Sequence, residues 1–179
     1  MVVQNALQTI QHASLVDLAQ EYVGNGWRVI PVPYMSKAPT INDWPNLQIT
    51  LDNLDHHFSG GQMNIGVVLG QASGNLIDVD VDDDLALKLA PRLLPPTNCI
   101  FGRKSRPRSH WLYYAQPIQG TSKLVGPGRM MLVEIRGDGQ QTIFPGSVHP
   151  SGEAIEFDDS GDPGHSDPTE LQAAVTKRT

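Results

Sequence analysis

Acidic and apolar residues alternate between Ile77 and Asp83, and this stretch carries the clearest chemical signal in the chain. If it forms a strand, its apolar side chains point to one face and its carboxylates to the other. The apolar face then holds Ile77, Val79 and Val81, and the acidic face holds Asp78, Asp80 and Asp82. Carboxylates two residues apart on a strand lie roughly 7 Å apart and repel each other unless a cation lies between them. Such a face suits Mg²⁺ or Mn²⁺, although a solvent-exposed edge strand gives the same pattern.

The acidic run continues into Asp83 and Asp84, directly before an apolar helical segment that we expect Pro91 to end. Carboxylates at the start of a helix stabilise the positive end of its dipole. We therefore interpret Asp83 and Asp84 as helix caps, and Asp82 is doubtful as a ligand. Asp78 and Asp80 lie too far upstream to cap this helix, so capping does not explain them.

A third carboxylate lies on another predicted strand, at residues 130–136, where Glu134 and Arg136 share one face. Two metal ions that catalyse phosphoryl transfer must be bridged and neutralised, which calls for a further carboxylate beside Asp78 and Asp80. Taken alone, a strand glutamate beside an arginine more often forms a surface ion pair. The pattern therefore indicates a metal site only in combination with the aspartate strand.

His110 begins a predicted strand and follows the basic loop 102–109. Its imidazole, with Ser109, could hydrogen-bond a phosphate while Arg106 and Arg108 pair with the phosphate charge. A strand histidine is more often a structural hydrogen-bonding group. Lys37, in a loop after an early strand, could also reach a phosphate, although most loop lysines are simply solvated.

Composition narrows the class of protein. The chain has 179 residues, 39% of them hydrophobic, which suits one globular domain with a sizeable core. The single cysteine, Cys99, excludes an internal disulfide and a thiolate zinc cluster, and it fits a reducing, cytoplasmic environment. The net charge of −6 argues against gripping duplex DNA by bulk charge. No apolar run is long enough to span a membrane, and we expect no membrane partner.

Patterning predicts a leader at 1–12, a domain at 13–157, an acidic linker at 158–166 and a helix at 167–179 that leads into a further region. A capping box at Ser14–Asp17 begins the first helix, and Thr50 is expected to cap a second. Strands are expected at 27–32, 64–69, 77–81, 98–101, 110–114, 130–136, 142–145 and 154–157. The strands 64–69 and 77–81 are joined by a tight turn, which favours a hairpin.

The order of these motifs resembles the bifunctional DNA primase/polymerase (prim-pol) domain of the archaeo-eukaryotic primase superfamily, common in plasmid and phage replicases. The resemblance extends from about Ala19 to Phe157. It rests on 26–32 (GWRVIPV), 37–39 (KAP), 64–70 (NIGVVLG), 75–80 (NLIDVD), 109–113 (SHWLY), 133–139 (VEIRGDG) and 145–152 (PGSVHPSG). Each segment is unspecific alone, but together, in this order, they are typical of that family.

The resemblance implies an α+β fold, with an α/β N-terminal lobe packed on an RRM-like sheet lobe. It implies that Asp78, Asp80 and Glu134 bind two Mg²⁺ or Mn²⁺ ions. His110 and Ser109 match the position that contacts the nucleotide triphosphate, while Arg136 and Lys37 match positions near the nucleotide or template. Two positions depart from the family pattern: Glu134 stands where aspartate is common, and the loop before His110 is basic instead of glycine-rich.

These observations predict a DNA primase/polymerase that uses a single-stranded DNA template, a primer and (d)NTPs in the replication of a plasmid, phage or mobile element. A helicase or helix-bundle region of the same replicase is an expected partner. Two alternatives remain at this stage: a non-catalytic nucleic-acid or nucleotide-binding module, and a metal-dependent phosphodiesterase that uses the same carboxylates in hydrolysis.

Overall fold

The computed structural model describes residues 14–116 and 121–176. The leader predicted at 1–12 and the last three residues of the chain lie outside the described residues. The helices are α1 (Leu15–Gly24), α2 (Leu54–Phe58), α3 (Asp84–Leu93) and α4 (Pro168–Thr176). The strands are β1 (Arg28–Pro33), β2 (Met63–Val68), β3 (Leu76–Val81), β4 (Cys99–Arg103), β5 (Arg106–Tyr114), β6 (Thr121–Val125), β7 (Met131–Arg136), β8 (Gln141–Ile143), β9 (Ile155–Ser160) and β10 (Gly164–His165).

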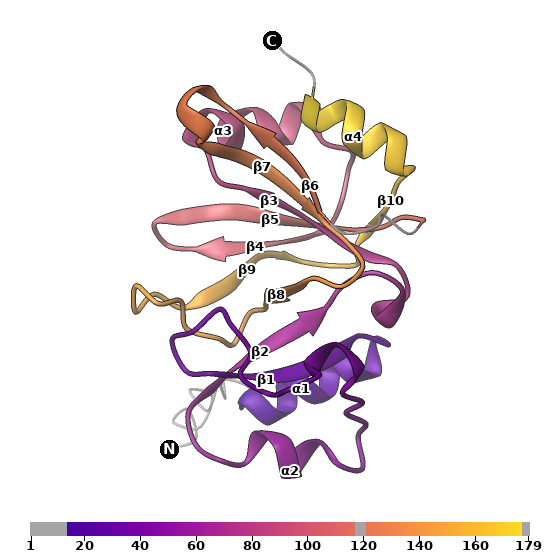
Figure 1. The fold of residues 1–179 in the computed structure, drawn as a ribbon, viewed down its shortest axis with the longest axis vertical. Coiled ribbons are helices and arrows are strands. Elements are labelled where there is room, and N and C mark those ends of the chain that lie inside the picture. Colours follow the sequence, from indigo (N-terminus) through magenta and orange to yellow (C-terminus); the bar gives the residue numbers. More distant parts are fainter. Residues whose placement is uncertain (1–13, 117–120, 177–179) are drawn as a thin grey trace, which may run out of the picture.

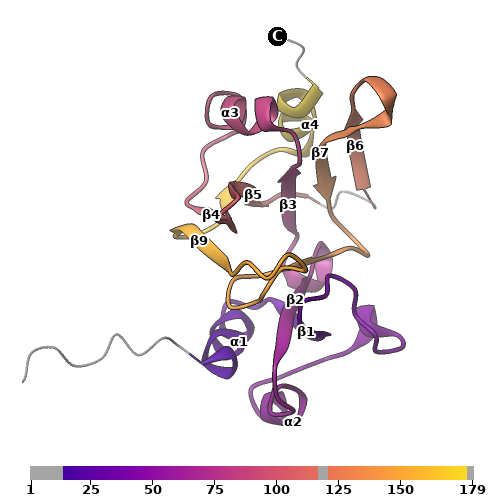
Figure 2. The same ribbon diagram turned by 90° about the vertical axis from the view of Figure 1, so that its left-hand side faces the viewer.

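The fold is a mixed α+β structure with two mostly antiparallel sheets. The small sheet has the order β1-β2-β8, and the large sheet has the order β6-β7-β3-β5-β4-β9, with β10 parallel to β5. Helices α1 and α2 lie at the end of the molecule with the small sheet, whereas α3 and α4 lie at the opposite end (Figures 1 and 2). None of the helices in the described ranges has the length and apolar character needed to cross a membrane.

Helix α1 packs against the small sheet, and together they form one of the two hydrophobic cores. The predicted capping box begins this helix: Asp17 N–H donates to the Ser14 hydroxyl, and Ser14 N–H donates to the Asp17 carboxylate. Tyr22, on its buried face, donates a hydrogen bond from its hydroxyl to the Pro145 carbonyl at 3.0 Å. Trp27 donates from its indole N–H to the Tyr114 hydroxyl at 2.8 Å, which ties the small sheet to the large one.

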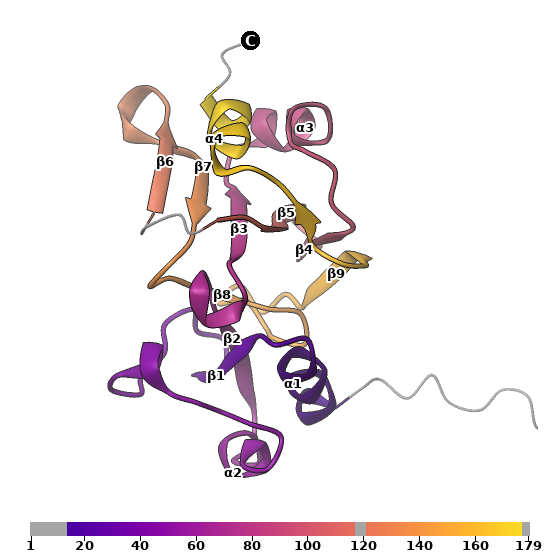
Figure 3. The same cartoon turned by 90° about the vertical axis from the view of Figure 1, so that its right-hand side faces the viewer.

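Strand β3 lies in the middle of the large sheet, between β5 and β7. Its alternation follows the prediction, because Ile77, Val79 and Val81 pack in the core that faces α3 and α4 (Figures 1 and 3). All six of its residues are buried, which excludes the solvent-exposed edge strand. The opposite face therefore holds carboxylates inside the protein, where they must find partners.

The predicted hairpin between 64–69 and 77–81 is wrong. Strand β2 pairs with β1 and β8, while β3 belongs to the large sheet, and only an isolated bridge joins Gly70 to Leu76. Gly70 has φ +76° and ψ −145°, and the short 3₁₀ turn Gln71–Ser73 follows it. This backbone conformation, which favours glycine, sends the chain from one sheet into the other.

Two predicted helix boundaries also change. Pro91 lies inside α3, which continues to Leu93. Proline cannot donate to the Leu87 carbonyl and its ring crowds that carbonyl, yet the helix continues for two more residues. Helix α2 is preceded by Asn53, not capped by Thr50, whose N–H donates to the Asn53 side chain at 2.8 Å. Leu51, Asp52 and Asn53 are exposed, so a helix that began at Thr50 would bury none of these three side chains; burial starts at Leu54.

Three of the later strands, β4, β5 and β9, are longer than predicted, whereas β7 and β8 are each one residue shorter. Most of the basic loop 102–109 belongs to β4 and β5, which form a hairpin around Lys104 and Ser105. Residues 158–160, expected in a linker, continue β9, and Gly164–His165 forms β10. The predicted start of the C-terminal helix is confirmed, because the Asp167 carboxylate accepts from Thr169 N–H at 2.7 Å, with Pro168 as the first helical residue.

Candidate active site

The carboxylates meet on the acidic face of β3 because of strand register. Asp80 is the direct cross-strand partner of His110 on β5 and of Glu134 on β7. Asp78 lies opposite Arg136 on β7. Cross-strand partners project side chains from the same face within contact distance. The carboxylates are deeply buried: 0% of Asp78, 5% of Asp80 and 9% of Glu134 is exposed.

Arg136 is the central cation of this cluster. Its Nη2 lies 2.6 Å from Oδ2 of Asp80 and 2.7 Å from Oε2 of Glu134. Its Nε also donates to the same Glu134 oxygen at 2.7 Å, and Nη1 lies 3.9 Å from Oδ2 of Asp78. Lys123, on β6, contacts the other Glu134 oxygen at 3.2 Å. A forked guanidinium with several nitrogens can serve carboxylates of neighbouring strands at once.

His110 is oriented by polar contacts at one edge of its ring and by stacking on one face. Nδ1 lies 3.0 Å from Oδ2 of Asp78 and 3.6 Å from Oδ1 of Asp80. The ring stacks on Phe101, its cross-strand partner on β4, with centroids 4.7 Å apart and planes 19° apart. The Thr142 hydroxyl donates to Oδ2 of Asp78 at 2.6 Å. Asp78 is therefore held by several groups and is the most constrained carboxylate of the cluster.

The electrostatics favour charged forms at most of these groups. Burial opposes ionisation of Asp78, but His110, Arg136 and Thr142 outweigh it and lower its pKa. Burial raises the pKa of Asp80, and the nearby cations offset this only in part. Burial also works against charge on His110 and Arg136, yet the carboxylates raise the pKa of both. The result is an internal ion network with its own positive charges.

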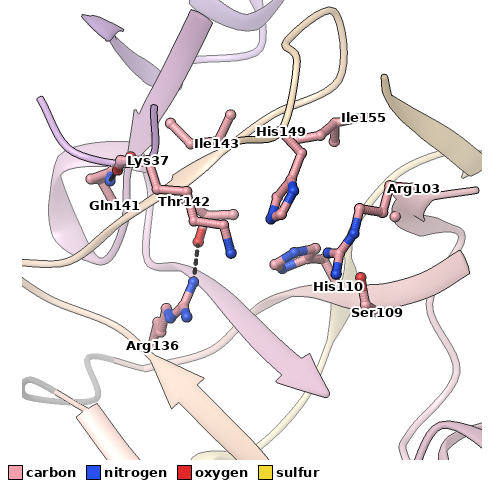
Figure 4. A pocket seen from close by; sticks show the side chains of 11 residues that line it. Lys37, Arg103, Ser109, His110, Arg136, Gln141, Thr142, Ile143, His149 and Ile155 are labelled. Carbon is pink, nitrogen blue, oxygen red and sulfur yellow. Dashed lines mark hydrogen bonds between the residues drawn. The ribbon is translucent and has the colours of Figure 1, made fainter. Parts of the chain in front are cut away.

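A pocket opens next to the carboxylates and shares His110 and Arg136 with them. It is lined by Lys37, Gly102, Arg103, Ser109, His110, Arg136, Gln141, Thr142, Ile143, His149 and Ile155. Figure 4 shows the side chains of Lys37, Arg103, His110 and His149 converging on the centre of this pocket. None of the described residues that line it is acidic. The pocket therefore has the charge of an anion-binding site.

Two side-chain polar atoms of residues that line this pocket lack partners within the described part of the protein: the Ser109 hydroxyl and the amide oxygen Oε1 of Gln141. Ser109 is only 1% exposed. The Gln141 amide orientation is fixed, because its NH₂ donates to the Lys37 carbonyl at 2.7 Å. Buried polar atoms are nearly always paired, so these two atoms are available to pair with a molecule that enters the pocket.

Comparison with protein families identifies the chain. The model of the family described as bifunctional DNA primase/polymerase, N-terminal, matches residues 19–173. The chain belongs to this family. A comparison with curated proteins found no match. The Prim-Pol family comprises DNA primase/polymerase-type nucleotidyltransferases, and a domain of this type binds DNA and nucleotides.

The structure brings together most of the residues that the sequence analysis selected in this Prim-Pol domain. Asp78, Asp80, Glu134, His110 and Arg136 form the ion network, and Lys37 and Ser109 line the adjoining pocket. Asp82 is exposed beyond the end of β3. The Asp83 carboxylate accepts hydrogen bonds from Leu85 and Ala86 N–H, as expected of a helix cap.

Arg106 and Arg108 are placed elsewhere. Arg106 pairs with Asp84 of α3 at 3.1 Å. Helix α3 lies on the side of the large sheet opposite the carboxylates, so Arg106 points away from the site. Arg108 pairs with Asp159 at 2.7 Å, and its guanidinium lies 5.1 Å from the Trp111 ring. The cause is a bulge in β5, where Arg108 has φ +54° and the pairing with β4 shifts register. Closeness to His110 in the sequence, on which the prediction for these two arginines rested, therefore does not bring their side chains to the pocket.

Arg103 and His149 are pocket residues that the sequence analysis did not select. Arg103 was seen only as one charge of the basic loop, and His149 only as part of the segment 145–152. Burial lowers the pKa of His149, and the nearby positive charges of Arg103 and Lys37 lower it further. Thr142 and Lys123 were likewise missed as partners of Asp78 and Glu134. Their sequence positions carry no spacing signal that would have found them.

The carboxylates fit a hard divalent cation by donor type and by convergence. Oxygens of Asp80 and Glu134 already share one cationic nitrogen of Arg136, so a single positive centre can contact both. Among the described residues, no group of three or more His, Cys, Asp or Glu side chains is arranged as a ready metal site. The carboxylates thus provide suitable metal ligands, and a guanidinium lies between two of them.

Proposed function

We propose that this Prim-Pol domain is a template-dependent nucleotidyltransferase that primes and extends DNA by two-metal phosphoryl transfer. The 3′-hydroxyl of a primer, or of the first nucleotide, attacks the α-phosphate of the incoming nucleotide. The new P–O bond replaces the bond to the β-phosphate, and pyrophosphate leaves. The replication of a plasmid, phage or mobile element as the setting, and a helicase or helix-bundle region as partner, stay predictions from the family resemblance.

One observation carries this proposal: a cluster of three carboxylates adjoins a cationic pocket, and the two share His110 and Arg136. A metal–triphosphate needs both kinds of surface, because the metal requires anionic oxygens and the phosphates require cations. A simple anion-binding module would have no use for three buried carboxylates, whose burial is costly. The juxtaposition therefore favours a nucleotidyltransferase.

Each group has a role in this proposal. Asp78, Asp80 and Glu134 would hold Mg²⁺ or Mn²⁺, which when bound lowers the pKa of the attacking hydroxyl and neutralises charge on the phosphates. Lys37 and Arg103 attract the triphosphate into the pocket, which His149 also lines. The orphan Ser109 hydroxyl donates to a phosphate oxygen. His110, already held by Asp78 and Phe101, offers its remaining ring nitrogen to a phosphate.

The test is a primer-synthesis and primer-extension assay on single-stranded DNA, with Mn²⁺ or Mg²⁺ and with ribonucleotides and deoxynucleotides supplied separately. The matched variant is Asp80→Asn, which keeps the side-chain volume but removes the charge. Wild-type protein should produce extended products, and Asp80→Asn should lose at least about 10²-fold in rate, in line with loss of an essential electrostatic contact. Template shortening would identify a phosphodiesterase, and retardation of DNA without chemistry would identify a binding module. Full activity in Asp80→Asn would overturn the proposal.

A further inference from the structure

Arg136 occupies a position that a divalent metal would need. Its guanidinium makes three contacts of 2.6–2.7 Å with Asp80 and Glu134. Of the Arg136 side chain, 22% is exposed, so the group faces the opening of the cluster and is not walled in. The contacts are made by the carboxylate oxygens on which the proposed metal site depends.

A guanidinium and a divalent cation compete for Oδ2 of Asp80 and Oε2 of Glu134, the oxygens that Arg136 contacts. Each Arg136 nitrogen carries part of a full positive charge, and Coulomb repulsion from a dication a few ångströms away is strong in a partly buried site. A metal ion that binds through these two oxygens also uses lone pairs that the Arg136 N–H groups now contact. In the described residues, the carboxylates are not arranged as a ready metal site.

We propose that Arg136 is an exchangeable counter-cation: a divalent metal binds Asp80 and Glu134 by displacing its guanidinium. The inference rests on the proposed function, because it takes these carboxylates as metal ligands. Without metal, Arg136 prevents the repulsion between three buried carboxylates that would otherwise weaken the fold. With metal, the same side chain must move to another anionic partner.

The adjoining pocket supplies that partner. Arg136 already lines it, and its Nη1 lies 3.5 Å from the Thr142 hydroxyl at the pocket wall (Figure 4). Because none of the described lining residues is acidic, the displaced guanidinium gains a charged partner only when a phosphate enters. The metal thus takes the carboxylates of this ion pair, and the triphosphate takes the guanidinium. Binding of either ligand therefore favours binding of the other through Arg136.

The experiment measures metal binding without catalysis. Free Mn²⁺ is titrated into the wild-type chain and into Arg136→Gln, and the unbound ion is quantified by electron paramagnetic resonance. Gln keeps a polar side chain of similar reach but carries no competing charge. Arg136→Gln should bind Mn²⁺ at least about tenfold more tightly, which corresponds to about 1.4 kcal/mol for the ion pair that the metal no longer has to break.

Three variants serve as controls. Arg92→Gln removes an equal charge from the exposed surface of α3 and should leave Mn²⁺ affinity unchanged. Lys123→Gln removes a half-exposed contact to Glu134 and should tighten binding by less than Arg136→Gln. Arg136→Lys retains a charge without the forked geometry and should fall between wild type and Arg136→Gln.

The outcomes separate this inference from the proposed function. If Asp80→Asn binds Mn²⁺ as well as wild type, the metal does not use this cluster and the proposed metal site is wrong. If Asp80→Asn loses binding while Arg136→Gln binds no tighter than wild type, the metal site stands and the exchange is wrong. If Arg136→Gln is unfolded without metal, Mn²⁺ should restore its melting transition. The same Mn²⁺ concentration should not restore the transition of the double variant Asp80→Asn/Arg136→Gln. If Mn²⁺ does not restore Arg136→Gln, or restores both variants equally, the exchange is wrong.

Discussion

Arg103 and Arg106 are cross-strand partners in the β4–β5 hairpin, yet their side chains serve opposite sides of the large sheet. Arg103 lines the cationic pocket and contacts Glu153 at 3.3 Å. Arg106 pairs with Asp84 on α3. Gly102 permits this arrangement, because a Cβ there would lie 2.4 Å from the Arg106 carbonyl oxygen. The hairpin thus offers two arginines of equal charge, of which one belongs to the candidate site.

This pair gives the first prediction. Arg103→Gln should weaken binding of a non-hydrolysable nucleoside triphosphate about tenfold or more, as expected for loss of a charged hydrogen-bond donor. Arg106→Gln, which removes the same charge from the same hairpin, should change binding less than about twofold. Fluorescence anisotropy with a labelled nucleotide measures both. Equal losses in the two variants would show that the hairpin acts through bulk charge.

Ser109 gives a prediction in which binding and stability move in opposite directions. Its hydroxyl is buried at the pocket without a partner in the described residues. Ser109→Ala removes this unsatisfied group, so the free energy of unfolding should stay equal or rise by up to about 1 kcal/mol. Nucleotide affinity should nevertheless fall by about three- to tenfold, because a phosphate loses a donor. Urea unfolding and anisotropy on the same preparations test the two halves; a loss of stability would mean that the hydroxyl has a structural partner.

Local sequence pattern predicted the part of the site that depends on alternation within one strand. The split between Ile77, Val79 and the aspartates follows from a period of two, and a buried strand maintains it. The role of Glu134 as third carboxylate came from its motif, and register with β3 places it beside Asp80. The alternation needs no knowledge of distant contacts, whereas the position of Glu134 beside Asp80 depends on the pairing of β3 with β7.

What the sequence could not supply depends on pairing between distant segments. The β5 bulge that turns Arg106 and Arg108 away lies where β4 and β5 pair, next to the close approach of Gly102 to the Arg106 carbonyl, and the residue types alone do not specify this register. The change of sheet at Gly70 depends on a backbone conformation that the residue type permits but does not require. Arg103 and His149 meet only because separate hairpins pack together, which no local spacing records.

Asp78 and Asp80 differ in how much each stabilises the fold, so a loss of activity in a variant has to be compared with its loss of unfolding free energy. Asp78 is fully buried and accepts from Thr142 and His110, so its removal leaves those groups unpaired. We expect Asp78→Ala to lose about 3 kcal/mol of unfolding free energy. Asp80→Asn keeps a polar group beside Arg136 and should lose clearly less, as measured by urea unfolding in EDTA; equal losses would contradict this ranking.

Gly70 connects the two sheets and should be sensitive to a single methyl group. A Cβ there would lie 2.6 Å from Cα of Asp138, and its φ of +76° disfavours other residues. Gly70→Ala should therefore lose more than about 3 kcal/mol, from steric overlap with backbone in addition to conformational strain. Gly139→Ala is the matched control, because its φ is +77° but no atom lies within 4 Å of the new Cβ. Its loss should be only about 1–2 kcal/mol. Similar thermal unfolding of the two variants would exclude the steric contribution.

His149 makes nucleotide binding depend on pH in a predictable direction. Burial and the charges of Arg103 and Lys37 hold its pKa below the ordinary value, so the free site keeps a neutral imidazole near neutral pH. A polyphosphate between these groups cancels their positive field and raises the His149 pKa, so binding takes up a proton. Linkage then requires affinity to rise as pH falls from the pKa of the bound state towards that of the free state, by at most about tenfold per pH unit for one proton.

The measurement compares tripolyphosphate affinity of wild type and His149→Gln from pH 8 to pH 5.5 in EDTA, so that the titration of the ligand itself cancels between the two proteins. Wild type should gain affinity relative to the variant as the pH falls; parallel pH profiles would show that His149 takes up no proton on binding.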